Sequence, residues 1–418
     1  MVHSLRIRPG GALHGRIRVG GAKNSVLKLM AATILARGTH VLHNVPRISD
    51  VDYMAELLRS MGLSVQWLGP DSMEIVRPDA IVSEAPYELV ERMRASIVVL
   101  GPLLASEGMA RVALPGGDDF GPRPIDMHLR ALEDLGVRFT TSHGFVEATT
   151  DQLVGANLLL EFPSVGATEN AMMAGVLATG TTVIDNAARE PEIADLANFL
   201  NAMGGSVTGA GSSTVVIEGV TSLHPATHEV IPDRIEAATF LAAIGVAGGE
   251  VVVERARIDH MEMLVTKLVD MGMTIDQTPE GLAVCGPERL RSVDVATLPY
   301  PGIATDYKPM LVAMLATADG VGIVTENLFA GRFRYIDELV RMGADIRTEG
   351  HHAVVRGLPQ LSGAPVKAPD IRAGAALAVA ALAAEGETII SGADHIERGY
   401  EHFVDKLSGI GVDIAVVQ

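Results

Sequence analysis

Apolar and polar positions along the chain follow a plan that recurs six times. Residues 167–180, ATENAMMAGVLATG, are apolar on nearly every side of a helix, which predicts a buried helix. Residues 181–186, TTVIDN, are rich in β-branched side chains and predict a short strand. Residues 190–205, EPEIADLANFLNAMGG, predict an amphipathic helix with acids in its first turn. Segments 206–211 and 213–220 then predict a hairpin that completes the unit.

The second helix of all six units ends in the same way. A hydrophobic residue is followed there by glycine, at Met61-Gly62, Leu135-Gly136, Met203-Gly204, Met271-Gly272, Met342-Gly343 and Ile410-Gly411. Glycine after the last apolar residue of a helix is the usual left-handed cap, and a strand can start directly after it. A unit of roughly 70 residues is too long for a solenoid repeat. The pattern therefore predicts an α/β fold in which two lobes hold three repeated units each.

The polar stretch 228–236, HEVIPDRIE, lies near the middle of the chain. It falls between the third and fourth units, so we expect it to be the hinge between the two lobes. Two lobes of equal size imply a cleft between them, and such a cleft is the usual place for a ligand.

Composition narrows the classes of ligand. The chain has 418 residues, 48% of them apolar, and a formal net charge of −18, so it can bury large cores but does not attract nucleic acid overall. A local arginine cluster can still bind a small anion in an acidic protein. The N-terminus has no apolar signal segment, and the longest apolar run, 373–384, is too short to span a membrane. We therefore expect a cytoplasmic protein that binds neither nucleic acid nor membrane.

A single cysteine and scattered histidines argue against disulfides and metal sites. Cys285 lies in the apolar, strand-like segment GLAVCGP, and we expect it to be a small buried side chain rather than a nucleophile. The 13 histidines do not cluster at the spacing of metal ligands. Segment 19–25, VGGAKNS, lacks the order of a triphosphate-binding loop, and no dinucleotide-binding glycine pattern follows a strand. The sequence predicts no metal and no cofactor.

Basic residues recur at one place in the repeats, near the starts of the buried helices. Lys23 and Asn24 precede the first buried helix, Arg94 the second and Arg372 the last, while Asp233 and Arg234 open the fourth. A helix N-terminus favours anions, and a basic residue placed there strengthens the site. Any one of these residues alone would more simply be a solvated cap residue. Their repetition favours an anion site facing the space between the lobes.

Ten segments, in this order, carry a resemblance to a known family. They are GGAKNSVLKLMAATIL, MRASIVVLGPLLA, LPGGDDFGPRPIDMH, SVGATEN, NAAREPEI, DRIEAATF, ATDYKPM, GRFRYIDELVRMGAD, DIRAGAALAVAALAAEG and HIERGYEHF. From Leu5 to Val416 the chain resembles the UDP-N-acetylglucosamine 1-carboxyvinyltransferases, enolpyruvyl transferases of the enolpyruvylshikimate-phosphate (EPSP) synthase superfamily. The resemblance implies an inside-out α/β barrel. Its first lobe is 22–231 with the loop 114–124, and its second is 1–21 with 232–418.

The reaction of that family joins phosphoenolpyruvate to the sugar 3-hydroxyl of UDP-N-acetylglucosamine, the first committed step of peptidoglycan precursor synthesis. The hydroxyl adds to the enol carbon while the methylene is protonated, and phosphate then leaves the tetrahedral intermediate. Such chemistry needs cations for phosphate and carboxylate, an acid that protonates carbon, and a base near the hydroxyl. The resemblance therefore implies these two substrates as partners and requires no cofactor.

The resemblance also assigns roles to residues at matching positions. The implied catalytic residues are Lys23, Asp118 as the acid and Asp306 as the base. Those implied to contact phosphoenolpyruvate are Lys23, Arg123 and Arg398 at its phosphate, with Arg94, Arg332 and Arg372 around its carboxylate and the cleft. Those implied to hold the acceptor are Asn24 and Asp306 for the sugar, Ser164, Val165 and Gly166 for the diphosphate, and Arg123, Pro124, Asp126 and His128 for uridine. Thr305 and Leu328 are implied to be further substrate-binding residues.

Three positions depart from the family pattern. Asp118 stands where most members carry a cysteine that acts as the general acid and is alkylated by fosfomycin. A carboxylate is a poorer target for an epoxide than a thiolate, so the aspartate implies fosfomycin insensitivity. Ala304 stands where proline is usual, and Phe162 where lysine is common. These two positions leave open transfer to another uridine nucleotide in secondary metabolism. A paralogue that binds UDP-sugars without catalysis is the remaining alternative.

Overall fold

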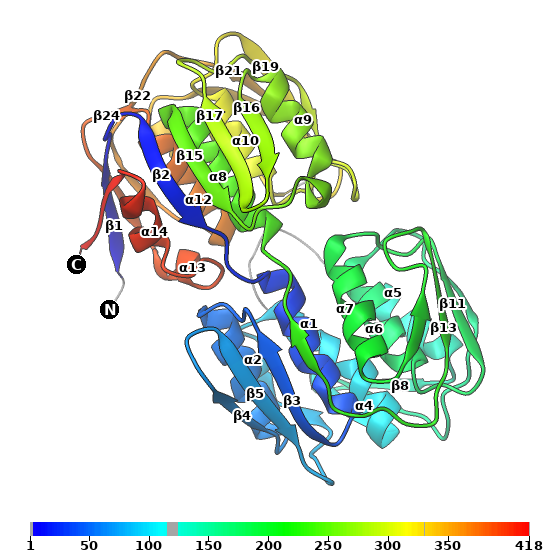
Figure 1. Cartoon of the computed structure of the whole chain (residues 1–418). Coiled ribbons are helices and arrows are strands. Elements are labelled where there is room, and N and C mark those ends of the chain that lie inside the picture. The colour runs from blue at the N-terminus through cyan, green and yellow to red at the C-terminus, as the bar shows by residue number, and fades with distance from the viewer. Residues whose placement is uncertain (1–2, 115–123, 330, 418) are drawn as a thin grey trace. The chain divides into compact units, whose positions relative to one another are not determined.

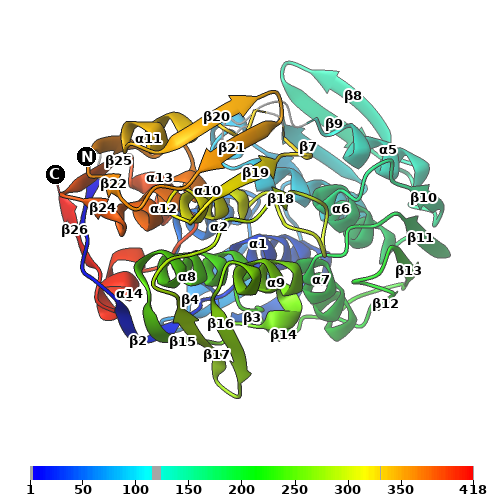
Figure 2. The ribbon, with the colours of Figure 1, turned by 90° about the horizontal axis from the view of Figure 1, so that it is seen from above.

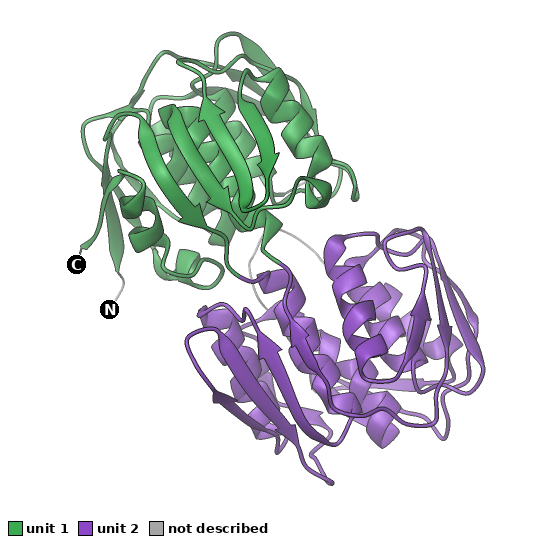
Figure 3. Ribbon diagram, in the orientation of Figure 1, with its two compact units in different colours: residues 1–20, 119–121, 232–418 green, residues 21–118, 122–231 purple. Residues whose placement is uncertain are grey.

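The computed structural model describes residues 3–114, 124–329 and 331–417, which divide into two compact units (Figure 3). Unit 1 joins the N-terminal segment up to Gly20 with the chain from Pro232 onward, and unit 2 begins at Gly21 and ends at Ile231. Followed through the described residues, the chain therefore leaves unit 1 after two strands and returns to it at Pro232.

Unit 1 contains most of the C-terminal half of the chain (Figure 1). Its helices are η3 (Ile258–His260), α8 (Arg234–Ala247), α9 (Glu262–Asp270), α10 (Lys308–Leu315), α11 (Ile336–Arg341), α12 (Ile371–Ala381), α13 (Asp394–Glu397) and α14 (Phe403–Gly409). Its strands are β1 (Ser4–Arg8), β2 (Leu13–Arg18), β15 (Gly249–Glu254), β16 (Thr274–Thr278), β17 (Gly281–Gly286), β18 (Val295–Ala296), β19 (Val321–Thr325), β20 (Asp345–Glu349), β21 (His352–Arg356), β22 (Leu361–Ser362), β23 (Pro365–Lys367), β24 (Ala384–Glu385), β25 (Thr388–Ser391) and β26 (Asp413–Val417).

Unit 2 is built in the same way. Its helices are α1 (Lys23–Ala32), η1 (Thr33–Leu35), α2 (Ser49–Ser60), α3 (Tyr87–Val90), η2 (Arg94–Val99), α4 (Leu100–Glu107), α5 (Asp126–Asp134), α6 (Val165–Gly175) and α7 (Pro191–Ala202). Its strands are β3 (Gly38–His43), β4 (Ser64–Trp67), β5 (Ser72–Arg77), β6 (Glu84–Ala85), β7 (Met109–Ala113), β8 (Arg138–Ser142), β9 (Phe145–Thr149), β10 (Asn157–Leu159), β11 (Thr181–Asp185), β12 (Ser206–Thr208), β13 (Thr214–Glu218) and β14 (Thr227–Glu229).

Among the described residues, one sheet topology occurs three times in each unit. Every four-stranded sheet has a parallel pair at one edge and two antiparallel pairs beyond it. The orders are β23-β25-β1-β26, β16-β17-β15-β2 and β18-β19-β21-β20 in unit 1, and β10-β11-β13-β12, β14-β3-β5-β4 and β6-β7-β9-β8 in unit 2. The sixfold repeat predicted from the apolar pattern is thus confirmed, including the hairpin of β12 and β13.

The N-terminal strand completes the last repeat. In the third repeat the central antiparallel strand, β13, directly follows β12 in the chain. In the sixth repeat this central place is taken by β1, which lies between β25 and β26 and pairs antiparallel with both. Since β2 also pairs in parallel with β15, both N-terminal strands are hydrogen-bonded into unit 1.

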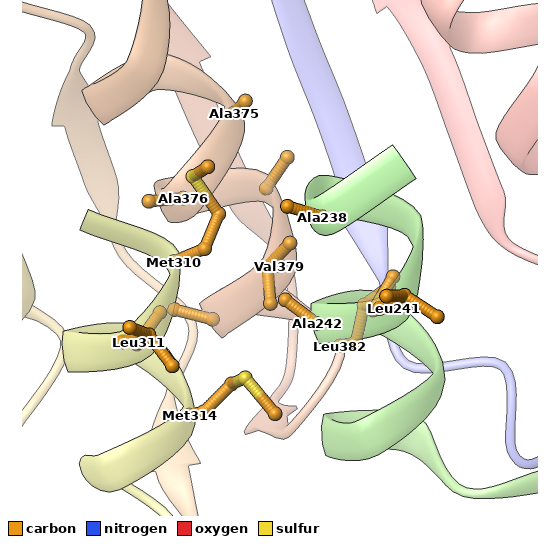
Figure 4. Close-up of a cluster of buried hydrophobic side chains, with 14 of the residues drawn as sticks. Ala238, Leu241, Ala242, Met310, Leu311, Met314, Ala375, Ala376, Val379 and Leu382 are labelled. Carbon is orange, nitrogen blue, oxygen red and sulfur yellow. The ribbon is translucent and has the colours of Figure 1, made fainter. Parts of the chain in front are cut away.

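The buried helices form the centre of each unit and the sheets lie outside them. In unit 1, α8, α10 and α12 pack against one another through Leu241, Met310, Met314, Val379 and their neighbours (Figure 4). The sheet containing β19 and β21 covers α10, and Figure 2 shows these elements together. Alanine is frequent on these helices, so their backbones approach closely with apolar contact on nearly every side. This is the inside-out α/β arrangement expected from the sequence.

The predicted helix ends are confirmed at all six repeat glycines. Gly62, Gly136, Gly204, Gly272, Gly343 and Gly411 have φ between 89° and 105°, the left-handed region that glycine adopts without strain. The buried helix of the third repeat is shorter than expected and ends at Gly175. The carbonyl of Val176 accepts a hydrogen bond from the amide of Val220 instead of from the next helical turn. A neighbouring segment therefore ends this helix.

Cys285 is exposed, so the expectation that it is buried was wrong. It lies on β17, where Leu282 and Val284 are buried and Cys285 pairs with Glu250 and Thr274. Successive side chains of a strand point to opposite faces, so the buried neighbours turn Cys285 outward. In the part of the chain that the structure describes, no helix is long and apolar enough to cross a membrane.

Candidate functional site

The basic residues singled out in unit 2 lie at helix starts, as the sequence predicted. Lys23 is the first residue of α1 and Asn24 the second, while Arg94 is the first residue of η2. Lys23 Nζ lies 2.7 Å from the carboxylate of Asp50, whose side chain is 2% exposed. Asp50 was not predicted from the sequence, because nothing in the segment SDVDY distinguishes an ion-pair partner from an ordinary first-turn acid. It holds the lysine at the helix start.

The residues expected to bind uridine lie near Arg94. The guanidinium of Arg94 donates a long hydrogen bond of 3.4 Å to the carbonyl of Pro124, and Asp126 begins α5. His128 lies two residues further along α5 and is buried. Burial lowers the pKa of His128 to about 4, and the nearby charge of Arg94 adds to the effect. A neutral imidazole is therefore expected throughout the physiological pH range.

His128 joins the expected uridine residues to the expected diphosphate residues. Its Nδ1 accepts a hydrogen bond of 2.8 Å from the side-chain amide of Asn170, which also donates to the carbonyl of Ile97. The imidazole packs directly on Gly166, because a Cβ at that position would lie 2.7 Å from the ring. The side chain of Ser164 caps α6 by accepting from the amide of Ala167. The positions implied for uridine and diphosphate thus share one buried contact in unit 2.

We expect Gly166→Ala to weaken binding of a nucleotide sugar by at least about tenfold. The added methyl would force the imidazole of His128 or the start of α6 to shift, and such overpacking commonly costs about 1–3 kcal/mol. Titration calorimetry measures the loss, and thermal melting shows whether the fold survives. Gly409→Ala in α14 is the matched control, since a Cβ there meets nothing within 4 Å. Unchanged affinity in Gly166→Ala would remove this contact from the binding site.

A second cluster lies in unit 1, at the starts of α10 and α12. Asp306 forms ion pairs with two buried arginines, with Oδ1 2.7 Å from Arg332 Nη1 and Oδ2 3.5 Å from Arg372 Nε. Arg332 Nη1 also donates to the hydroxyl of Thr305 at 3.1 Å. Burial alone would lower the pKa of Arg332, but the carboxylates of Asp306 and Asp370 hold it above its usual value. The cluster is a carboxylate held between two permanent cations.

The side chain of Asp306 is 25% exposed, whereas those of Arg332 and Arg372 are 4% and 5% exposed. The carboxylate is therefore the accessible member of the cluster. Leu328 lies in the same unit, and its amide donates to Glu326 at 2.8 Å. Arg398 follows α13 in this unit and is half-buried. Arg234 begins α8, and its guanidinium donates a hydrogen bond of 3.0 Å to the hydroxyl of Tyr307. This buried contact lies next to Asp306 in the chain.

Two predicted site residues, Asp118 and Arg123, lie outside the described residues. Within the described ranges, no group of three or more His, Cys, Asp or Glu side chains could hold a metal ion. Two further charged residues close to predicted site positions were missed by sequence reasoning. Lys308 and Glu326 are completely buried in unit 1 and contact the backbone or side chains of Thr305, Leu328 and Arg332. Only the buried environment distinguishes them from surface charges.

A buried carboxylate makes unit 2 sensitive to pH. Burial raises the pKa of Glu169 to about 7, although Lys28 at 3.5 Å opposes the shift. Between pH 4.5 and 7 the folded protein retains a proton that the unfolded chain has released, so stability is lost as pH rises through this window.

We expect Glu169→Gln to remove this loss. A shift of this size corresponds to at most about 3 kcal/mol of unfolding free energy. Urea unfolding at pH 5 and pH 8 measures the difference between wild type and variant. The exposed Glu133 on α5 provides the control Glu133→Gln, which should leave the pH dependence as it is. An equal loss of stability in wild type and Glu169→Gln would contradict the assignment.

Comparisons with known proteins show the family of the chain. Residues 7–407 match the family EPSP synthase (3-phosphoshikimate 1-carboxyvinyltransferase). The chain is 50% identical over 414 residues to the UDP-N-acetylglucosamine 1-carboxyvinyltransferase of Mycobacterium leprae, covering 99% of both chains. It is also 50% identical to UDP-N-acetylglucosamine 1-carboxyvinyltransferase 1 of Symbiobacterium thermophilum, covering 98% of this chain and 94% of that protein.

Two solved structures have similar folds. The enolpyruvyl transferase NikO from Streptomyces tendae superposes with a TM-score of 0.88 at 26% identity, over 100% of this chain and 99% of that chain. An EPSP synthase from Acinetobacter baumannii superposes with a TM-score of 0.78 at 21% identity, over the full length of both chains. The second likeness concerns the fold alone.

Proposed function

The chain belongs to the EPSP synthase family of enolpyruvyl transferases, and we propose that its site residues transfer the enolpyruvyl group from phosphoenolpyruvate to UDP-N-acetylglucosamine. It is a UDP-N-acetylglucosamine 1-carboxyvinyltransferase, acting in peptidoglycan precursor synthesis. Full-length identity of 50% to proteins of that name supports this assignment. Because both substrates are metabolites of the cytoplasm, we place the reaction there.

The single observation that carries the mechanism is the Asp306–Arg332–Arg372 cluster of unit 1. Guanidinium groups bind carboxylate and phosphate oxygens through paired N–H donors, so the two arginines suit the carboxylate of phosphoenolpyruvate. Asp306, the accessible member, is the proposed base for the sugar 3-hydroxyl. The hydroxyl of Thr305 accepts a hydrogen bond from Arg332 and so holds its guanidinium in place. The position of Asp306 is therefore defined before substrate binds.

In unit 2, Lys23 and Asn24 at the start of α1 are the proposed contacts of the phosphate and the acceptor sugar. The lysine is held by Asp50, and the positive end of the helix dipole adds to its attraction for an anion. Pro124, Asp126 and His128 are proposed to hold uridine, with Arg123, while Ser164, Val165 and Gly166 hold the diphosphate through the start of α6. Arg94 and Arg398 complete the proposed set of cations.

Asp118 is the proposed general acid, in the place where most relatives carry cysteine. A carboxylic acid can protonate the methylene carbon. The enzyme would then act without a thiol at this position and resist fosfomycin, because a carboxylate reacts poorly with an epoxide.

One observation favours a second candidate for the acceptor substrate, another uridine nucleotide. Phe162, where lysine is common, is 42% exposed and precedes Ser164, whose amide donates to its carbonyl at 2.7 Å. An aromatic side chain offers no charge to the diphosphate and can instead contact a base or sugar. A different uridine nucleotide is therefore worth testing as the acceptor.

One assay tests the proposed function. Purified protein is incubated with phosphoenolpyruvate and UDP-N-acetylglucosamine, and released phosphate and the enolpyruvyl ether are measured. UMP, UDP and uridine replace the acceptor in parallel reactions. We expect the highest kcat/KM with UDP-N-acetylglucosamine. Higher values with another nucleotide would select the second acceptor, and ligand binding without phosphate release would select a non-catalytic UDP-sugar-binding paralogue.

A further inference from the structure

A buried ion pair in unit 1 contacts Thr305 and Arg332, the two neighbours of the proposed base Asp306. Lys308 begins α10, and Glu326 follows β19. Lys308 Nζ lies 2.8 Å from Glu326 Oε2, and both side chains are 0% exposed. Two charges removed from water are costly unless additional hydrogen bonds satisfy their remaining donors and acceptors. The neighbours of this pair therefore show what it holds in place.

Within the described residues, all the groups that hydrogen-bond to the side-chain carboxylate of Glu326 are donors. Oε1 accepts from the hydroxyl of Thr297 at 2.7 Å and from the amides of Leu328 and Phe329 at 2.8 and 3.1 Å. Oε2 accepts from the hydroxyl of Thr305 at 2.8 Å in addition to Lys308. Only a carboxylate can accept from all of these groups, because an amide would direct its own N–H donors at one side of the cluster.

Lys308 completes the arrangement from the opposite side. Its ammonium donates 2.5 Å to the carbonyl of Arg332 and lies 4.0 Å from the ring centre of Phe333. Burial lowers the pKa of Lys308 to about 8, although the carboxylate of Glu326 opposes this shift. The ammonium thus ties the segment that carries Arg332 to the start of α10.

A chain of hydrogen bonds connects Glu326 to Asp306 through Thr305 and Arg332. Because Thr305 donates its only hydroxyl proton to Glu326, its oxygen lone pair is available to Arg332 Nη1 at 3.1 Å. The same Nη1 lies 2.7 Å from Asp306. Glu326 therefore determines the direction of the Thr305 hydroxyl proton. The Thr305 oxygen in turn positions the guanidinium of Arg332, and this guanidinium positions the carboxylate of Asp306.

We propose that the Lys308–Glu326 pair is a positioning element of the transferase, acting through Thr305 and the backbone of Arg332 to hold Asp306 and Arg332 in the reactive geometry. The proposal rests on the proposed function of Asp306 and Arg332, and it deepens that function by adding two residues that do not touch substrate. The amide of Leu328, a proposed substrate contact, donates to the same carboxylate. One buried pair thus contacts three residues of the proposed site, Thr305, Leu328 and Arg332.

A merely structural ion pair would behave differently on replacement. Substituting both members of a buried pair by uncharged residues is often neutral for folding, whereas removing one member leaves an uncompensated charge. The double variant Lys308→Met/Glu326→Gln therefore separates the two roles. It restores the balance of buried charge, but the amide at 326 cannot accept from all the donors around it.

The experiment measures Tm, kcat and both KM values for Lys308→Met, Glu326→Gln and the double variant. We expect lower Tm in the single variants and recovery toward wild type in the double variant. We expect kcat to stay about 100-fold low in the double variant, since a small misplacement of reacting groups has an effect of this size. If kcat recovers to within threefold of wild type together with Tm, the pair is only structural and the proposal is wrong.

The control is the ion pair of Arg77 with Glu107 in unit 2, whose side chains are 3% and 23% exposed. Arg77 ties together backbone segments away from the proposed site residues. Arg77→Met/Glu107→Gln should change Tm with kcat unaltered, and an equal fall in kcat would contradict a positioning role for Lys308 and Glu326. Wild-type protein is assayed first. Absence of phosphate release from wild type refutes the proposed function, whereas active wild type with fully active double variant refutes only the positioning proposal.

Discussion

Asp118→Asn is expected to lower kcat by about a thousandfold while nucleotide-sugar affinity changes little. A carboxamide has nearly the size of the acid but cannot deliver a proton to the methylene carbon, and loss of a general acid typically costs 10²–10⁴-fold. Stopped-flow or coupled phosphate release measures kcat, and calorimetry measures UDP-N-acetylglucosamine binding. Undiminished turnover in this variant would remove Asp118 from the mechanism.

Asp118→Cys is the informative companion, because it restores the residue type that most relatives carry. We expect it to retain measurable turnover and to become inactivated by fosfomycin, since a thiolate opens an epoxide readily. Asp119→Cys places the same thiol on the adjacent residue and should leave the enzyme insensitive. Insensitivity of Asp118→Cys would contradict the alignment of this position with the family cysteine.

Asp306→Asn is expected to have the second large effect, a fall in kcat of about 10²–10⁴-fold. The change removes the proposed base and also the negative charge between Arg332 and Arg372, which lie 2.7 and 3.5 Å from its two oxygens. The guanidinium groups released from Asp306 remain available to the carboxylate of phosphoenolpyruvate. The KM for this substrate should therefore rise by a much smaller factor than that by which kcat falls. Steady-state kinetics with each substrate varied in turn measures the separation of kcat from KM.

Asp345→Asn provides the control for removal of a carboxylate paired with arginine in the same unit. Asp345 lies 3.3 Å from Arg356 on neighbouring strands, and both side chains are exposed. Exposed ion pairs contribute little to stability, so this variant should retain wild-type kinetics and Tm. Equal loss of kcat in Asp306→Asn and Asp345→Asn would show that the effect is not specific to the proposed base.

Periodic features of the chain could be predicted because they depend on local rules. The six glycines from Gly62 to Gly411 mark helix ends through backbone conformation, which is a property of the residue itself. Buried helices such as α6 and α8 are recognisable because their apolar residues cover every face. The starts of α1 and α12 could likewise be anticipated, and Lys23 and Arg372 lie there.

Contacts between distant segments required the tertiary structure. Neither Lys308 nor Glu326 differs from a surface charge in its sequence context, and only packing of α10 against the strand preceding Glu326 removes both from water. Similarly, no local rule states that the imidazole of His128 lies on Gly166, since 37 intervening residues fold between them. Cys285 was misjudged because a run of apolar residues does not show which face of a strand is covered.

The amino-acid sequence by itself determined the sixfold repeat, the α/β class, the helix ends and the family, because these follow from side-chain periodicity, glycine geometry and ordered motifs. Tertiary structure alone decided that β1 completes the last sheet, that Asp306 lies between two arginines, and that a buried ion pair supports Thr305. The physical reason is desolvation. The strength of a charge or hydrogen bond depends on which distant segments exclude water from it, and that exclusion exists only once the chain has folded.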